Sequence, residues 1–137
     1  MGVAYYPVFE GSDAGWPEDI NGKCLSRADK HFEKVCRKNS VSTLLEFFSM
    51  SRDQIIAELL NGDPDDPSTY DESNMTPEHW HDPAEGLKTI RVLLDFVKAN
   101  ANQFADADCV REDLEAFEKA LRWAEMNGVR WHLAMDY

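Results

Sequence analysis

The chain has 137 residues, of which 43% are apolar and 29% are charged, the composition of an ordinary single globular domain. Its 14 lysines and arginines face 26 aspartates and glutamates, so the formal net charge is −12, and this balance argues against a nucleic-acid-binding protein. No apolar run approaches the roughly 20 residues of a membrane-spanning helix, so we expect no membrane partner.

The amino-terminal residues predict a strand at the edge of a sheet. Residues 3–9 are rich in β-forming side chains, and Pro7 confines them to an edge because it has no N–H to donate. The same segment has neither the basic region nor the long apolar stretch of a signal peptide. We therefore expect a cytoplasmic protein.

A basic amphipathic helix is predicted at about residues 27–38, with Ser26 as its N-cap. Six basic side chains share one face at 100° per residue: Lys23, Arg27, Lys30, Lys34, Arg37 and Lys38. A solvated outer face has this pattern. So does a site for a phosphate or an acidic partner, and an acidic segment of the same chain could also dock there.

Two shorter helical segments follow, each preceded by a capping box. Residues 43–46 read Thr-Leu-Leu-Glu before an aromatic pair, and residues 51–54 read Ser-Arg-Asp-Gln before an apolar run. Gly62 is the expected stop of the second segment.

The acidic residues concentrate in the stretch that comes next. Residues 61–86 contain eight carboxylates and no lysine or arginine, together with four prolines, which predicts a long acidic loop at about 61–82. A calcium-binding EF-hand loop is excluded, because the glycine and glutamate required at its sixth and twelfth positions are replaced by Ser68 and Asn74.

A helical hairpin is predicted in the second half of the chain. Asp82 and Pro83 are a favourable N-cap and first residue, with Glu85 completing a capping box, for a helix at about 83–101. A second helix at about 107–127 begins at Asp106 or Asp108 and stops at Gly128. The short connection makes the two helices antiparallel.

The carboxyl-terminal residues predict the second strand. Trp131, Leu133 and Met135 alternate with polar or small residues, which indicates a half-buried strand with His132 on its polar face. Since two isolated strands need partners, we expect the terminal strands to pair and the helical hairpin to cover them. The predicted fold is therefore mostly α (α+β), a single domain over residues 1–137 with a small terminal β-sheet.

Histidines and tyrosines are the candidates for a ligand pocket between the hairpin and the terminal strands. They are His79, His81, His132, Tyr5 and Tyr6. The pair His79 and His81 is not predicted to bind a metal, because no third ligand follows at a supportive spacing. No motif for a nucleotide, a dinucleotide or catalytic zinc is present, so we assign no catalytic residue and no cofactor.

The three cysteines, Cys24, Cys36 and Cys109, are an odd number without a Cys-x-x-Cys pair. We expect all three to be reduced thiols, as in a cytosolic protein.

Two functions of different class are compatible with these patterns. The first is a non-catalytic interaction module that binds a basic protein partner, a role for which antitoxin and immunity proteins have a similar charge profile. Its expected contact residues are Asp63, Asp65, Asp66, Asp71 and Glu72. The alternative is a small enzyme or ligand-binding protein that uses the histidine and tyrosine pocket.

Overall fold

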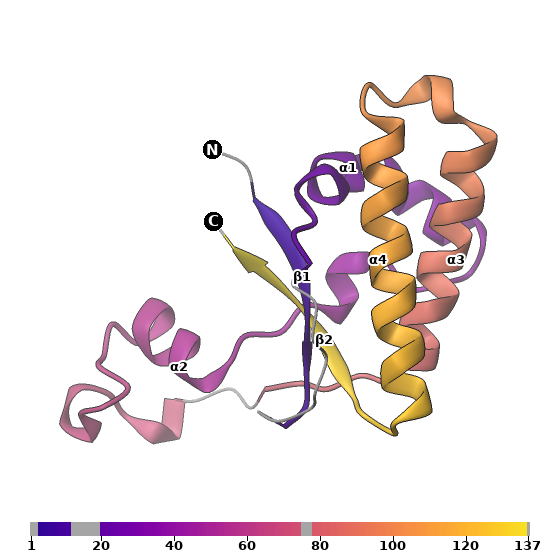
Figure 1. Cartoon of the computed structure of the whole chain (residues 1–137). Coiled ribbons are helices and arrows are strands. Elements are labelled where there is room, and N and C mark those ends of the chain that lie inside the picture. The colour runs from indigo at the N-terminus through magenta and orange to yellow at the C-terminus, as the bar shows by residue number, and fades with distance from the viewer. Residues whose placement is uncertain (1–2, 12–19, 75–77, 137) are drawn as a thin grey trace. The chain divides into compact units, whose positions relative to one another are not determined.

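The computed structural model describes residues 3–11, 20–74 and 78–136, which contain two strands and four α-helices besides short 3₁₀ and π-helical segments. In chain order they are β1 (Ala4–Phe9), α1 (Lys23–Lys38), α2 (Arg52–Gln54), α3 (Pro83–Ala99), α4 (Ala107–Met126) and β2 (Trp131–Asp136). The chain divides into two compact units, one formed by residues 1–48 and 80–137 and the other by Ser49–His79 (Figure 1). The predicted fold class is confirmed.

The two terminal strands pair antiparallel, as predicted. The register runs from Ala4 opposite Asp136 to Phe9 opposite Trp131. Pro7 lies in β1, and among the described residues the outer side of this strand forms one bridge, between Tyr5 and Gly22. Pro7 therefore needs no second ladder bond, which is why an edge strand tolerates it.

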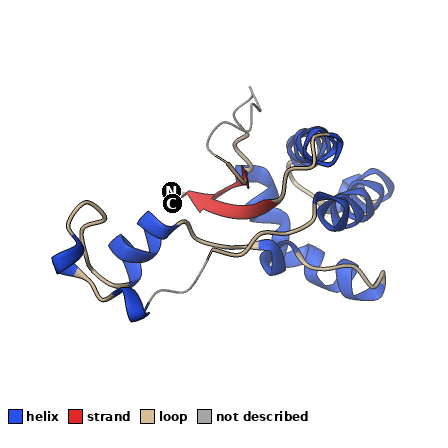
Figure 2. Ribbon diagram, turned by 90° about the horizontal axis from the view of Figure 1, so that it is seen from below, coloured by secondary structure: helices blue, strands red, loops and turns tan. Residues whose placement is uncertain are grey.

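Helices α3 and α4 form the predicted antiparallel hairpin, and Figure 2 views them nearly end-on beside the strands. The Asp82 carboxylate caps α3 by accepting a hydrogen bond of 2.9 Å from the Ala84 N–H. Glu85 contacts Lys88 at 3.1 Å. Helix α4 ends as predicted, with Gly128 in the left-handed region at φ 64°. None of the helices in the described segments is long and apolar enough to cross a membrane.

The core of this unit is built around Trp131, Phe32 and Phe117, whose side chains are fully buried. Gly86 lets the indole ring of Trp131 lie directly on helix α3. A Cβ atom at Gly86 would be 2.5 Å from Cζ2 of that ring, closer than carbon atoms can approach. The absence of a side chain at residue 86 is therefore a packing requirement.

Strand β2 is covered on both faces, so the prediction of a half-buried strand with His132 on a polar face was wrong. Residues 131–134 are all buried, His132 included. The Trp80 ring packs on the imidazole with their centroids 4.8 Å apart. The edge of β2 that faces away from β1 is also partly paired. At this edge Trp131 exchanges backbone hydrogen bonds of 2.7 and 3.0 Å with His81.

Helix α1 begins four residues earlier than predicted, and Ser26 is not its N-cap. Gly22 occupies the cap position, and Ser26 Oγ instead donates to the carbonyl oxygens of Val3 and Lys23. A free N–H of the first turn, that of Leu25, is satisfied by the Asp113 carboxylate of α4 at 3.0 Å. Burial raises the pKa of Asp113. The cap therefore comes from a residue distant in sequence, which local reading cannot identify.

The expectation of three reduced cysteines was also wrong. Cys24 and Cys109 form a disulfide across 85 residues of sequence, with their Cα atoms 5.9 Å apart. Helices α1 and α4 place their amino-terminal turns side by side, which sequence spacing does not reveal. Cys36 is a free thiol and fully buried, and this burial raises its pKa to about 11.

Candidate functional site

The acidic contact residues predicted from the sequence all belong to the second unit, Ser49–His79, which we call the acidic unit. Its helical start is local: Ser51 Oγ accepts from the Gln54 N–H at 3.3 Å, and the Gln54 side chain accepts from the Ser51 N–H at 3.3 Å. This is the predicted capping box. The helix α2 continues as a π-helical turn over Ile55–Leu59, with Ile55 and Ile56 buried.

The chain leaves this helical segment one residue before the predicted stop. Asn61 adopts the left-handed region at φ 54°, and Gly62 provides room for a close approach instead. A Cβ atom at Gly62 would lie 2.9 Å from Cβ of Tyr70. The acidic stretch folds back over this point through 3₁₀ turns at Pro67–Thr69 and Glu72–Asn74.

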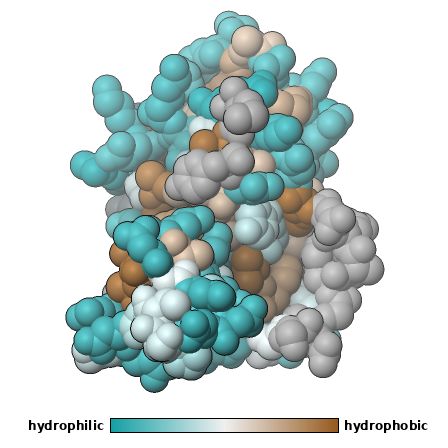
Figure 3. All heavy atoms as spheres, turned by 90° about the vertical axis from the view of Figure 1, so that its left-hand side faces the viewer, coloured by the Kyte–Doolittle hydropathy of each residue, from teal (hydrophilic) through white to brown (hydrophobic). Residues whose placement is uncertain are grey.

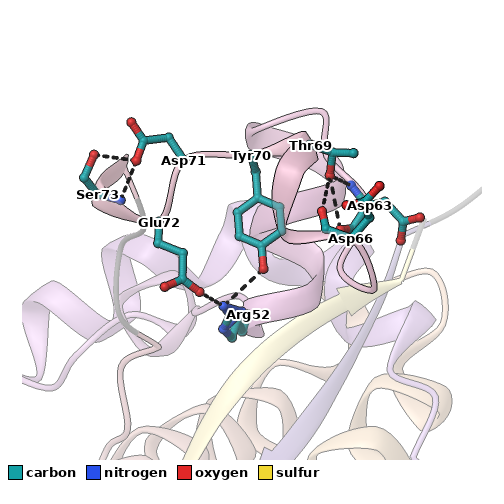
Figure 4. Close-up of polar contacts among 8 residues, drawn as sticks. All are labelled: Arg52, Asp63, Asp66, Thr69, Tyr70, Asp71, Glu72 and Ser73. Atoms are coloured by element: carbon teal, nitrogen blue, oxygen red, sulfur yellow. Dashed lines mark hydrogen bonds and ion pairs between the residues drawn. The ribbon is translucent and has the colours of Figure 1, made fainter.

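Three aspartates of the acidic stretch stabilise the turns of the loop by the same local hydrogen bond. The carboxylates of Asp63, Asp66 and Asp71 each accept a hydrogen bond from the backbone N–H two residues further on, at 2.9, 3.1 and 3.0 Å. Asp66 also accepts from the Ser68 hydroxyl at 2.7 Å. Asp71 accepts from the Ser73 hydroxyl, likewise at 2.7 Å (Figure 4). Such Asx turns bend a chain without help from a hydrophobic core.

The hydrogen bonds from the two serines favour the ionised form of Asp66 and Asp71. The Ser68 hydroxyl and N–H hold the pKa of Asp66 below its usual range, and Ser73 lowers the pKa of Asp71 in the same way. A hydrogen bond to the charged form of an acid favours that form. Both side chains are exposed, so they carry a full negative charge at neutral pH.

Arg52 is the one lysine or arginine in the acidic unit, and it is already engaged. It forms an ion pair with Glu72, and Nη2 lies 3.3 Å from the Tyr70 hydroxyl. Its guanidinium also lies 5.7 Å from the centre of the Tyr70 ring (Figure 4). Sequence reasoning missed this cluster, because the residues are 18 and 20 positions apart.

The acidic unit therefore has a large uncompensated charge. Residues 49–79 contain eight carboxylates and one arginine, so more than half of the formal charge of −12 lies in less than a quarter of the chain. No second lysine or arginine exists within the unit to neutralise the remainder. Figure 3 shows one face of the molecule, on which hydrophilic residues cover most of the described surface between smaller hydrophobic areas.

The predicted pocket residues are divided between the two units and engage different neighbours. Tyr5 donates from its hydroxyl to Asp29 at 2.7 Å and lines a cavity of about 450 Å³. The ring of His81 packs against Phe47 at 5.2 Å, whereas His132 packs against Trp80. The backbone of His79 donates to Ser49 Oγ at 2.9 Å within the acidic unit. Tyr6 lies opposite Ala134 in the terminal sheet.

Asp29 also lines the cavity beside Tyr5, and its burial changes its pKa. The Asp29 side chain has its pKa raised, mainly by burial and against the lowering effect of the Tyr5 hydrogen bond. Across the described ranges, the only group of three side chains placed to hold a metal ion is Cys24, Cys109 and Asp113. The acidic-loop carboxylates form no such group among the described residues.

Comparison with known proteins identifies no relative: no protein-family model, no curated protein and no solved structure matches the chain.

Proposed function

We propose that the protein is a non-catalytic interaction module whose acidic unit binds a basic protein partner. The observation that carries the proposal is the charge balance of Ser49–His79, where eight carboxylates face one arginine that is already paired with Glu72. Like charges held together on one surface repel each other, and a cationic partner relieves this repulsion.

The local hydrogen bonds make the surface suitable for such a role. Asp63, Asp66 and Asp71 are fixed by their own loop, so their charges are presented in a defined arrangement before any partner arrives. Pre-organised groups lose less conformational entropy on binding. Complementary charge also speeds association over a range of about 8 Å at physiological salt.

The test removes charge and keeps hydrogen bonding. In one variant Asp63, Asp65, Asp66 and Asp71 are replaced by asparagine, whose side-chain oxygen still accepts from the backbone. A matched variant makes the same change in net charge on exposed positions of the other unit: Asp95→Asn, Glu112→Gln, Glu125→Gln and Asp136→Asn. Both are compared with the parent for capture of proteins from an extract of the source cells, and then for association rates at low and high salt.

We expect a basic protein that the parent and the matched variant capture and the acidic-unit variant does not. Its association with the acidic-unit variant should be slower by at least tenfold at low salt, with a much smaller change in dissociation. If both variants lose the partner equally, only the net charge matters. If neither loses it and both melt as the parent does, the acidic unit is a solubilising surface.

The alternative of a small enzyme or ligand-binding protein has less support. His132 is buried against Trp80, and His79 belongs to a different unit from the other candidate residues. The expected cytoplasmic location remains a prediction, and the disulfide weighs against it, because such bonds persist mainly in oxidising compartments.

A further inference from the structure

Two sulfur atoms and a carboxylate meet where helices α1 and α4 begin. Cys24 is the second residue of α1, Cys109 is the third residue of α4, and Asp113 follows one turn later on α4. The two Sγ atoms and a carboxylate oxygen all lie within 4.8 Å of one another. At present the sulfurs are joined in the disulfide.

The carboxylate is held in place independently of the sulfurs. Its oxygen Oδ2 accepts the Leu25 N–H at 3.0 Å, in the first turn of α1. The backbone N–H of Cys24 also donates to the Asp113 side chain. The site therefore keeps Asp113 as its third donor when the disulfide is broken.

We propose that reduction converts the Cys24–Cys109 disulfide into a binding site for one divalent cation of the zinc class, with Asp113 as the third ligand. A phosphine reductant supplies two electrons to break the S–S bond. It takes the oxygen of one water molecule as phosphine oxide, and the two protons of that water go to the sulfurs. The cation then displaces these protons, which pass to solvent.

The donor set selects the class of cation. Thiolate sulfur and carboxylate oxygen are both ligands of zinc, which prefers four ligands in a tetrahedron, and water supplies the fourth. Calcium and magnesium prefer oxygen ligands only.

A cavity of about 240 Å³ borders the site at Cys24. Its walls include Cys24 and Arg27 from α1 and Phe104 from the turn between α3 and α4. Cys24 is therefore the ligand nearest to a route by which a small reductant or an ion could approach.

The experiment uses the full chain with Cys36→Ala, which removes the remaining thiol. The protein is reduced with a water-soluble phosphine, freed of reductant under nitrogen, and titrated with Zn²⁺. Bound metal is then measured after gel filtration, and helical content is followed by circular dichroism. Co²⁺ is the spectroscopic probe, because thiolate ligation gives it an intense ultraviolet charge-transfer band. The same protein with its disulfide intact is the control.

We expect one zinc ion per reduced chain and none on the oxidised chain, with the cobalt thiolate band in the reduced chain only. Asp113→Asn, whose amide oxygen can still accept from Leu25, should weaken binding at least tenfold. The matched Asp108→Asn, on an exposed side chain of the same helix, should not. A folded reduced chain without bound metal overturns the proposal. So does a reduced chain that unfolds and does not refold with Zn²⁺, and so does equal binding by the two aspartate variants.

Discussion

Reducing the Cys24–Cys109 disulfide should lower the free energy of unfolding by an amount that follows from the length of the loop it closes. The bond closes a loop of 85 residues, and the loss of this constraint on the unfolded chain corresponds to about 4.6 kcal/mol at 25 °C. That is a large part of the roughly 5–15 kcal/mol of a typical domain. With a urea dependence of about 2 kcal/mol per molar, the unfolding midpoint should fall by about 2 M.

Urea unfolding of the Cys36→Ala protein, followed by circular dichroism with and without phosphine reductant, measures this shift. A chelator excludes metal ions. The double variant Cys24→Ala/Cys109→Ala removes the same cross-link without reductant, so its midpoint should match that of the reduced protein. An unchanged midpoint in both would refute the reasoning, because the cross-link would then not restrict the unfolded chain.

Two further predictions concern single residues. Gly86→Ala gains about 1 kcal/mol of helix propensity but forces a methyl group onto the fully buried ring of Trp131, at a cost of about 1–3 kcal/mol. We expect a lower urea midpoint, and a raised midpoint would contradict the packing described for this site. Burial raises the pKa of Asp29, so its contribution to stability is complete below the ordinary value of 3.8 and is lost as pH rises through the raised value. Asp29→Asn should therefore melt higher than the parent at pH 7 and lose this advantage at pH 3; an equal difference at both pH values would contradict it.

The features predicted correctly from the sequence are those with local causes. Asp82 and Pro83 begin α3, Gly128 ends α4, and the capping box of Ser51 and Gln54 forms within four residues. In each case the partner groups are neighbours along the chain, so the sequence contains the whole interaction. The alternation in residues 131–136 likewise predicted a strand, because it follows from backbone geometry alone.

The features that could not be predicted depend on residues brought together by the fold. Helix α1 begins at Lys23, upstream of the predicted cap Ser26, and an N–H of its first turn, that of Leu25, is satisfied by Asp113, which lies 88 residues away in the sequence. The disulfide has the same origin, since it requires the starts of α1 and α4 to be adjacent. His132 is buried because Trp80 covers it, although its position in the alternation indicates exposure.

In the acidic unit, three aspartates take part in hydrogen bonds that form between near neighbours in the sequence. Asp63, Asp66 and Asp71 receive hydrogen bonds from donors two residues away, and an asparagine could receive the same bonds. The turns therefore require an acceptor at these positions but do not require a charge. Like charges concentrated within one compact unit repel each other, and the turns do not need them, which supports the proposal that the acidic unit binds a basic partner.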